Sequence, residues 1–314
     1  MNRPKPPRRR TSSEVKIQCL LPKRNNGEYF EVALKSLTEQ TYPFSNITVS
    51  DNYSTDGSYV RLQEVAGEHQ NVNVVRPPVP LESYGEHIAW LIGEVGIDSS
   101  YTLIASSDDV WHANFNSAMV HEISRFLEHP MCLFCDRIFI DSLGKRLGAT
   151  GNLSRPSSLD GQRAFDFYLQ GCCYIISGAL FQTSLLKPLA DLLEKTRNAA
   201  DWFLLLEAAR TGEVRYLAKG LFDYRVHPQG TGVNAGIDDS EHVLVALDNY
   251  ALWLEAVGDS VAARRVVCAL ESARGGGDRL QTSHPRVERA ARRIQMWSTV
   301  TGATYFLRGI LGRQ

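Results

Sequence analysis

The stretch Val15-Lys-Ile-Gln-Cys-Leu-Leu-Pro22 opens the part of the chain that decides the fold. Its short apolar run, ended by a proline, is typical of a strand buried inside a parallel sheet. Further strand-like runs follow at 46–50, 71–75 and 101–105. Segments with apolar residues at helical spacing alternate with these runs, at 28–40, 58–66, 84–95 and 114–127. Strands that alternate with helices indicate βαβ units, which build a parallel sheet covered by helices on both faces.

The pattern after residue 130 is less regular. We expect strands at 131–140, 214–217 and 221–227, and a loop rich in Gly, Ser and Asn at 144–158. We expect helices at 181–195, 199–210, 243–257, 261–273 and 287–302. The sequence therefore predicts three parts: a disordered basic tail (1–13), an α/β domain (14–235) and a helical C-terminal extension (236–314).

Charge is unevenly distributed along the 314 residues, although the formal net charge is only −1. Residues 1–13 carry five bases and no acid, and residues 260–314 carry ten arginines against three acids. The remaining residues, 14–259, hold 19 bases and 32 acids, a net charge of −13. An acidic body argues against a protein that binds nucleic acid through its folded domain. The basic ends permit contact with anionic lipid headgroups.

The composition also bears on the cellular compartment. No stretch approaches the roughly 18 apolar residues of a spanning helix, and the Pro/Arg-rich start lacks the apolar core of a secretory signal. The pair Cys132 and Cys135 has zinc-knuckle spacing, but no second pair or histidine motif completes a zinc site. We therefore expect a reduced, cytoplasmic protein, lying at the cytosolic face of the membrane if the basic ends bind lipid.

Polar side chains cluster directly after three of the predicted parallel strands, where ligands bind in open α/β sheets. They are residues 22–26, residues 51–57, and the pair Asp108 and Asp109. Adjacent carboxylates at a buried strand end are costly unless a cation offsets their charge, and oxygen ligands suit Mg²⁺ or Mn²⁺. The alternatives are ordinary turn chemistry at 51–57 and an Asp109 that only caps the following helix. Glycine-rich dinucleotide and P-loop motifs are absent from the sequence.

Seven segments, taken in order between residues 15 and 232, resemble the GT-A-fold glycosyltransferases of family 2, especially bacterial cell-surface polysaccharide enzymes. They are Val15–Pro22, Leu34-Lys-Ser-Leu-Thr-Glu-Gln-Thr41, Val49-Ser-Asp-Asn-Tyr-Ser-Thr-Asp-Gly57, Ala105-Ser-Ser-Asp-Asp-Val-Trp111, Ser177-Gly-Ala-Leu-Phe181, Asn198-Ala-Ala-Asp-Trp-Phe-Leu204 and Tyr224-Arg-Val-His227. The resemblance implies a Rossmann-like, mostly parallel central sheet flanked by helices. It also implies an inverting transfer of a sugar from a nucleotide-diphosphate sugar to a hydroxyl of a glycan or lipid-linked acceptor.

The resemblance assigns roles to particular residues. The nucleotide-sugar would contact Pro22, Arg24, Asp51, Asn52, Ser54, Asp56, Ser107 and Asp108. A divalent cation, Mn²⁺ or Mg²⁺, would be held by Asp108, Asp109 and His227. The acceptor side would include Trp111, Ser177, Gly178 and Trp202, and the base that deprotonates the acceptor would be Asp201. The sequence departs from the family pattern at Ser106 and Ala200, where the family has acidic residues.

Several of these assignments have a plainer alternative. Asp201 lies at the start of a predicted helix, where the macrodipole favours an ionised carboxylate, and it could serve only as a cap. Trp111 and Trp202 could stack on a sugar or simply pack, and His227 could be structural. For the whole protein, the alternatives are a nucleotidyltransferase and a non-catalytic carbohydrate-binding or scaffold protein on the same fold. An arginine-rich helix at 289–313 could lie on a membrane or pack on the domain.

Overall fold

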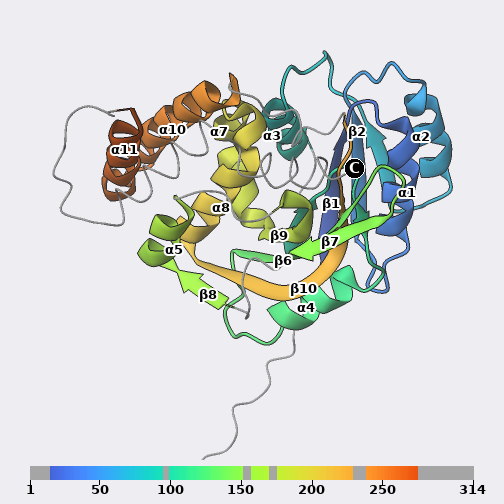
Figure 1. Cartoon of the computed structure of the whole chain (residues 1–314), viewed down its shortest axis with the longest axis horizontal. Helices are drawn as coiled ribbons and strands as arrows, with labels where there is room; N and C mark the ends of the chain where they lie inside the picture. The colour runs from blue at the N-terminus through green and yellow to red at the C-terminus, as the bar shows by residue number, and fades with distance from the viewer. Residues whose placement is uncertain (1–14, 95–98, 151–156, 170–174, 229–237, 275–314) are drawn as a thin grey trace, which may run out of the picture.

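The computed structural model describes residues 15–94, 99–150, 157–169, 175–228 and 238–274 (Figure 1). Its strands are β1 (Ile17–Lys23), β2 (Asn46–Asp51), β3 (Val72–Val75), β4 (Tyr101–Ile104), β5 (Val110–Trp111), β6 (Cys132–Ile140), β7 (Arg146–Thr150), β8 (Ser157–Asp160), β9 (Ala179–Gln182) and β10 (Glu213–Arg225). Its α-helices are α1 (Gly27–Thr38), α2 (Ser58–Gly67), α3 (Tyr84–Glu94), α4 (Phe115–Ile123), α5 (Gly161–Tyr168), α6 (Thr183–Leu186), α7 (Ala190–Glu194), α8 (Ala200–Thr211), α10 (Asp238–Ala256) and α11 (Ser260–Arg274). Short 3-10 turns cover Ile176–Gly178, Lys187–Leu189 and Arg197–Ala199.

These strands form one sheet with the order β3-β2-β1-β4-β9-β6-β10-β5 within the described residues, and β7 and β8 pair at its margins with β6 and β10. The first four strands are all parallel to one another. The sheet order reverses at β1, which has β2 on one side and β4 on the other. In open α/β sheets the carboxyl ends beside such a reversal form the ligand site.

The two faces of the sheet carry separate hydrophobic cores, because successive side chains of a strand point to opposite faces. On one face Ile17, Cys19 and Leu21 of β1 pack with the buried sides of α1, α2 and α4. On the other face Leu20 packs in a core that includes residues of α3, α5, α7, α8, α10 and α11. Figure 1 shows α1 and α2 on the opposite side of the sheet from α3, α7 and α10. The predicted α/β sheet with helices on both faces is confirmed.

The second half of the sheet differs from the expectation of simple alternation. β9 pairs antiparallel with both β4 and β6, so Phe181 lies in a strand and not in the helix expected over 181–195. Pro188 lacks a backbone N–H, and the rest of that segment is broken into α6, a 3-10 turn and α7. Part of the loop expected at 144–158 forms β7 and the start of β8. The two strands expected at 214–217 and 221–227 are one strand, β10, with irregular register around Gly220.

The C-terminal helices belong to the same core as the sheet. Leu247, Tyr250 and Leu254 of α10 are buried in one cluster with Phe203 of α8. The buried Glu207 of α8 accepts hydrogen bonds from Arg210 and from the Tyr250 hydroxyl, whose oxygen lies 2.5 Å from Oε1. α10 is therefore anchored to α8 by apolar and polar contacts, and α11 packs in the same cluster. The helix expected at 287–302 and the tail 1–13 lie outside the described residues.

Candidate functional site at the carboxyl edge of the sheet

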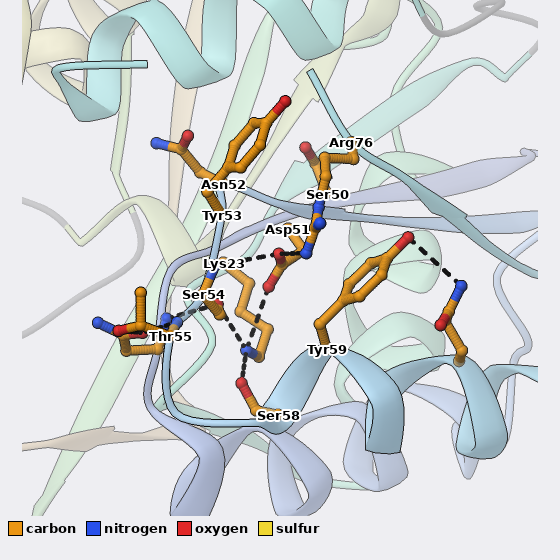
Figure 2. Close-up of polar contacts among 12 residues, drawn as sticks. Lys23, Ser50, Asp51, Asn52, Tyr53, Ser54, Thr55, Ser58, Tyr59 and Arg76 are labelled. Carbon is orange, nitrogen blue, oxygen red and sulfur yellow. Dashed lines mark hydrogen bonds and ion pairs between the residues drawn. The ribbon is translucent and has the colours of Figure 1, made fainter. Parts of the chain in front are cut away.

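A buried ionic cluster joins the ends of β1, β2 and β3 (Figure 2). Asp51, at the end of β2, is fully buried and accepts a hydrogen bond from Arg76 Nη2 at 2.6 Å. Its other oxygen lies 3.6 Å from the ammonium nitrogen of Lys23, whose side chain is also fully buried. Burial acts to raise the pKa of Asp51, but hydrogen bonds from Ser54 and Arg76 outweigh it and hold that pKa below its usual value. Asp51 is therefore an ionised carboxylate inside the protein.

Lys23 also fastens the loop that follows β2. Its ammonium group donates hydrogen bonds to the hydroxyls of Ser54 and Ser58 and lies 5.0 Å from the centre of the Phe30 ring. Burial lowers the pKa of Lys23, and the neighbouring Asp51 carboxylate opposes that shift. Sequence reasoning did not single out Lys23. Its signal was a cation at the end of a buried parallel strand, a position where an unpaired charge would be costly.

The loops after β1 and β2 are hydrogen-bonded to each other. Several residues that were predicted to contact the nucleotide take part in these bonds. Ser54 accepts a hydrogen bond from the backbone N–H of Asn25 at 2.7 Å, and Asp56 accepts one from Gly27 N at 2.9 Å. A Cβ atom on Gly27 would lie 3.0 Å from Asp56 Oδ2, so a side chain there would disturb this contact. Ser54 and Asp56 thus have a structural task in shaping the loops.

The remaining predicted nucleotide contacts lie along the same edge. Asn52 is buried and exchanges two hydrogen bonds, each 2.9 Å, with the backbone of Leu81. Pro22 is buried within β1, whereas Arg24 is exposed in the following loop. Ser107 is buried and its hydroxyl accepts a 3.3 Å hydrogen bond from Asn26.

Arg76 lies against two tyrosine rings, a contact that the sequence did not reveal. Its guanidinium lies 3.5 Å from the centre of the Tyr59 ring and 5.0 Å from that of Tyr53. Its Nε atom is buried without a hydrogen-bond partner in the part of the chain that the structure describes. Figure 2 shows Arg76 between the two tyrosines with its guanidinium turned toward Asp51. The β2 edge therefore presents a planar cation, two aromatic rings and a buried carboxylate.

The second part of the site is built on Asp108, in the loop after β4. Oδ1 of Asp108 accepts a hydrogen bond from the Ser106 hydroxyl at 2.5 Å, and Oδ2 lies 2.8 Å from Nε2 of His227. The Asp108 side chain is 15 % exposed, whereas that of His227 is fully buried. The structure thus joins two residues that the sequence assigned to the cation. It also brings Ser106, the departure from the family pattern, into direct contact with them.

Asp109 is placed differently from its neighbour. It is buried, and its Oδ1 accepts a hydrogen bond from the backbone N–H of Arg225 at 3.0 Å. Its Oδ2 is buried with no hydrogen-bond partner among the described residues. Burial, followed by the charge of Asp108, raises the pKa of Asp109 well above its usual value. Asp109 therefore lies behind Asp108, and it does not cap the helix α4 as the plainer alternative proposed.

Asp201 reaches this region from the first turn of α8. It is partly exposed, and its Oδ1 accepts a hydrogen bond from the backbone N–H of Trp202 at 2.8 Å. Besides burial, which is the main cause, the charges of Asp201, Asp108 and Asp109 all raise the pKa of Tyr84. The same three carboxylates raise the pKa of Tyr224, again after burial as the main cause. Carboxylates about ninety residues apart in the sequence thus act on the same two phenols.

Helix α3 brings Tyr84 to this position. Its first turn has a Ser-x-x-Glu arrangement, in which the Ser83 hydroxyl accepts from the Glu86 N–H and Glu86 accepts from the Glu82 N–H. Gly85 then lets α3 approach the segment before α8, because a Cβ atom there would lie 2.5 Å from the carbonyl oxygen of Leu193 and 2.7 Å from that of Arg197. Sequence reasoning missed Tyr84 because this contact is tertiary.

The residues predicted for the acceptor side are mostly packing residues in this structure. Trp111 and Trp202 are both 2 % exposed, and their indole N–H groups donate to the carbonyl oxygens of Ser177 and Tyr168. Ser177 is buried, and a Cβ atom on Gly178 would lie 2.4 Å from the Phe222 ring. This geometry favours packing over sugar stacking for both indoles.

The residues present fit a cation that is shared with a ligand. The described residues contain no group of three or more His, Cys, Asp and Glu side chains arranged to hold a metal ion. Asp108 supplies one carboxylate and His227 one imidazole. Mg²⁺-type ions are commonly bound by one or two carboxylates together with substrate phosphates. The pair therefore suits a cation completed by a diphosphate.

Comparison with known structures identifies the fold. TarS of S. aureus (residues 1–349, with UDP-GlcNAc) superposes with a TM-score of 0.61 and 15 % identity over 92 % of this chain and 83 % of that one. The mannosyltransferase PcManGT from Pyrobaculum calidifontis, solved with GDP-Man and Mn²⁺, gives a TM-score of 0.52 and 15 % identity over 95 % and 88 % of the two chains. GalNAc-T7 with UDP, GalNAc and Mn²⁺ gives 0.54 and 12 % over 95 % and 58 %. These likenesses show that the fold is GT-A, as the resemblance implied.

No curated protein matches the chain in sequence. The family model "Glycosyl transferase family 2" matches residues 19–188, which is more than half of the chain and includes β1, β2 and the Asp108 loop. With the fold, the ionic edge and the Asp108–His227 pair in place, this match decides the family: the chain belongs to glycosyl transferase family 2.

Proposed function

We propose that this glycosyltransferase moves a sugar from a nucleotide-diphosphate sugar to a hydroxyl of a glycan or lipid-linked acceptor, with inversion at the anomeric carbon. The observation that carries the proposal is the 2.8 Å contact between Asp108 and His227 at the carboxyl edge of the parallel strands. The charges of Asp108 and Asp201 both act on Tyr84 and Tyr224, which supports one shared site. Inversion by a single displacement needs a positive charge beside the leaving diphosphate and a base for the acceptor hydroxyl. Both must lie close to the anomeric carbon. A cation on the Asp108–His227 pair and a base at Asp201 would meet that requirement.

The nucleotide would bind along the edge formed by β1 and β2. We assign the base to the neighbourhood of Asp51 and Arg76, where a guanidinium and two tyrosine rings offer hydrogen-bond donors and flat surfaces. TarS was solved with UDP-GlcNAc and PcManGT with GDP-Man, and both share this fold. These neighbours support a nucleotide-sugar donor without distinguishing between uracil and guanine for this chain.

A divalent cation, Mn²⁺ or Mg²⁺, would be held by Asp108 and His227 beside the donor diphosphate. When bound, it would act as a Lewis acid for the leaving diphosphate. Mn²⁺ is present in the structures of PcManGT and GalNAc-T7, which supports this assignment. Asp109 would contribute from behind, through its hydrogen bond with the backbone of Arg225, and not as a direct ligand.

Asp201 would serve as the base. Its place in the first turn of α8 favours the ionised form, and its Oδ1 accepts a hydrogen bond from the Trp202 N–H. An ionised carboxylate facing the acceptor hydroxyl removes the proton as the new glycosidic bond forms. Ala200, which replaces an acidic residue of the family pattern, is fully buried, so a glutamate there would enter the core.

A donor screen followed by a transfer assay tests the proposal. UDP-sugars and GDP-sugars, each with Mn²⁺ and with EDTA, are first compared by thermal shift. Binding that depends on Mn²⁺, followed by slow hydrolysis or transfer of the bound sugar, is the expected result. Binding without any turnover across acceptors would favour the non-catalytic alternative. Release of pyrophosphate from a nucleoside triphosphate and a sugar phosphate would favour a nucleotidyltransferase.

A further inference from the structure

Arg225, the last residue of β10, holds together segments that are far apart in the sequence. Its guanidinium Nε donates to the backbone carbonyl of Asp108 at 2.9 Å. Nη1 of the same group donates to the carbonyls of Asp141 and Ser142, at 3.2 and 3.1 Å, in the turn between β6 and β7. Arg225 is only 7 % exposed, so these contacts are shielded from solvent. One side chain therefore links the β6–β7 turn to the Asp108 loop.

The same residue also supports His227. The Arg225 guanidinium lies 4.7 Å from the centre of the Tyr29 ring, and that ring lies 4.8 Å from the imidazole of His227. Tyr29 comes from α1 and is buried. The backbone N–H of Arg225 meanwhile donates to Asp109. Arg225 thus contacts the backbone of one member of the Asp108–His227 pair and, through Tyr29, the ring of the other.

The β6–β7 turn is internally braced. Oδ1 of Asp141 accepts hydrogen bonds from the backbone N–H groups of Leu143 and Lys145, at 3.0 and 2.8 Å. Gly144 has φ +82°, which a residue with a side chain adopts only with strain. Leu143 at the tip is 92 % exposed. The carbonyls that receive Arg225 therefore keep their positions because the Asp141 side chain fixes the turn around them.

We propose that Arg225 is a positioning residue that sets the geometry of the Asp108–His227 pair and couples it to the β6–β7 turn. The inference rests on the proposed function, in which that pair holds a cation on the donor diphosphate. The fork of donors on a guanidinium can serve several carbonyls at once and stack on a tyrosine. A lysine ammonium is a compact point charge and cannot reproduce that arrangement. Lysine at 225 would keep the charge and lose the link.

The first test measures how much Mn²⁺ is needed for nucleotide binding. Binding of UDP and of GDP is titrated against MnCl₂ for the full chain, for Arg225→Lys and for Arg210→Lys. Arg210 is the matched control, because it is a half-buried arginine that bridges Glu207 and Asp259 away from the site. We expect the half-saturating Mn²⁺ concentration to rise about tenfold in Arg225→Lys and to stay unchanged in Arg210→Lys, even where both lose similar thermal stability. Methylguanidinium added to Arg225→Ala should restore part of the loss.

The second test perturbs the turn without touching Arg225. Asp141→Ala removes the acceptor that braces the turn, whereas Asp141→Asn keeps an oxygen at that position. The half-saturating Mn²⁺ concentration should rise about two- to fivefold in Asp141→Ala and return close to the wild-type value in Asp141→Asn.

The outcomes separate this inference from the proposed function. Wild-type protein that binds UDP or GDP with Mn²⁺, together with an unchanged Mn²⁺ requirement in Arg225→Lys, would overturn the inference alone. An equal shift in Arg210→Lys would also overturn it, since the effect would then follow from lost stability. Wild-type protein without any Mn²⁺-dependent nucleotide binding would overturn the proposed function and the positioning role with it.

Discussion

His227 Nε2 lies 2.8 Å from Oδ2 of Asp108, although 119 residues separate the two in the chain. β10 runs parallel to β6 and ends beside the loop that follows β4, which brings His227 to the carboxylate. The contact joins the first and second halves of the domain at the edge where the parallel strands end. A carboxylate and an imidazole held in this way form the part of the site on which cation binding should depend.

The two neighbouring aspartates should respond differently to substitution. Asp108→Asn removes the charge proposed to hold the cation, so cation-dependent nucleotide binding should weaken at least about tenfold. Asp109→Asn replaces a buried carboxyl whose pKa is already raised, and it keeps an oxygen for the Arg225 N–H. We expect its binding to stay within about twofold of wild type. Calorimetric titration with Mn²⁺ checks both, and equal losses in the two variants would contradict the separation of their roles.

His87 should make the folded protein sensitive to mild acid. It is buried beneath the Ser50 hydroxyl, and burial lowers its pKa from 6.5 to about 4. The unfolded chain protonates His87 below about pH 6.5, whereas the folded chain protonates it only near pH 4. The stability that depends on a neutral His87 is therefore fully present above pH 6.5. As the pH falls toward 4, the free energy of unfolding drops by about 3 kcal/mol in total. Urea unfolding between pH 7.5 and 4 measures it.

His87→Gln provides the control for that pH dependence. Glutamine keeps a polar partner for Ser50 and does not titrate. The difference in unfolding free energy between wild type and His87→Gln should therefore change with pH in the stated direction. A difference that is flat between pH 7.5 and 4 would show that His87 is not the group responsible.

Two glycines of α3 should give opposite results when changed to alanine. Gly85→Ala places a methyl group against the carbonyls of Leu193 and Arg197, so we expect a loss of about 1–3 kcal/mol and lower turnover as Tyr84 shifts. Gly93→Ala meets nothing within 4 Å and should stabilise the helix by about 0.5–1 kcal/mol. Thermal unfolding and a transfer assay on both variants check this. Normal turnover in Gly85→Ala would show that the position of Tyr84 does not affect catalysis.

The basic ends predict a salt-sensitive attraction to anionic membranes. Described residues include no helix long and apolar enough to cross a bilayer. Each basic residue near an anionic surface contributes about 1 kcal/mol, and salt screens that attraction. The full chain should therefore float with vesicles that contain phosphatidylglycerol at low salt. It should dissociate from them at about 0.5 M salt, where screening is strong. A chain lacking residues 1–13 and 286–314 should not float, and equal flotation of both would show that the ends are not the contact.

The first half of the fold could be predicted from the sequence because it depends on local patterns. Buried parallel strands read as apolar runs, and α1 and α2 show their periodic apolar faces directly. The second half could not be predicted in the same way. β9 pairs with β4 and β6, which lie far from it in the sequence, and a four-residue strand followed by short helices resembles one helix.

The residues of the candidate site also differ in whether local sequence patterns could indicate them. Asp51 and Asp108 could be proposed from the sequence because acidic residues directly after strands carry a local signal, and Asp201 was proposed through the family resemblance. Lys23 and Arg225 were missed because their roles depend on tertiary contacts: a buried salt bridge and a set of carbonyls from distant segments. Glu207, the second carboxylate of α8, is held by Arg210 and Tyr250 in the core and could not be told from a site residue by sequence alone.

The measurement that tests the account most directly compares Asp201→Asn with wild type in both donor affinity and turnover. Asparagine keeps the oxygen that accepts from the Trp202 N–H and loses only basicity. Asp191→Asn, an exposed aspartate in the first turn of α7, is the matched control and should behave as wild type. We predict that Asp201→Asn keeps donor affinity within about twofold while turnover falls about 10²–10⁴-fold, the usual contribution of a general base. Normal turnover in Asp201→Asn, or loss of donor binding in its place, would contradict the account.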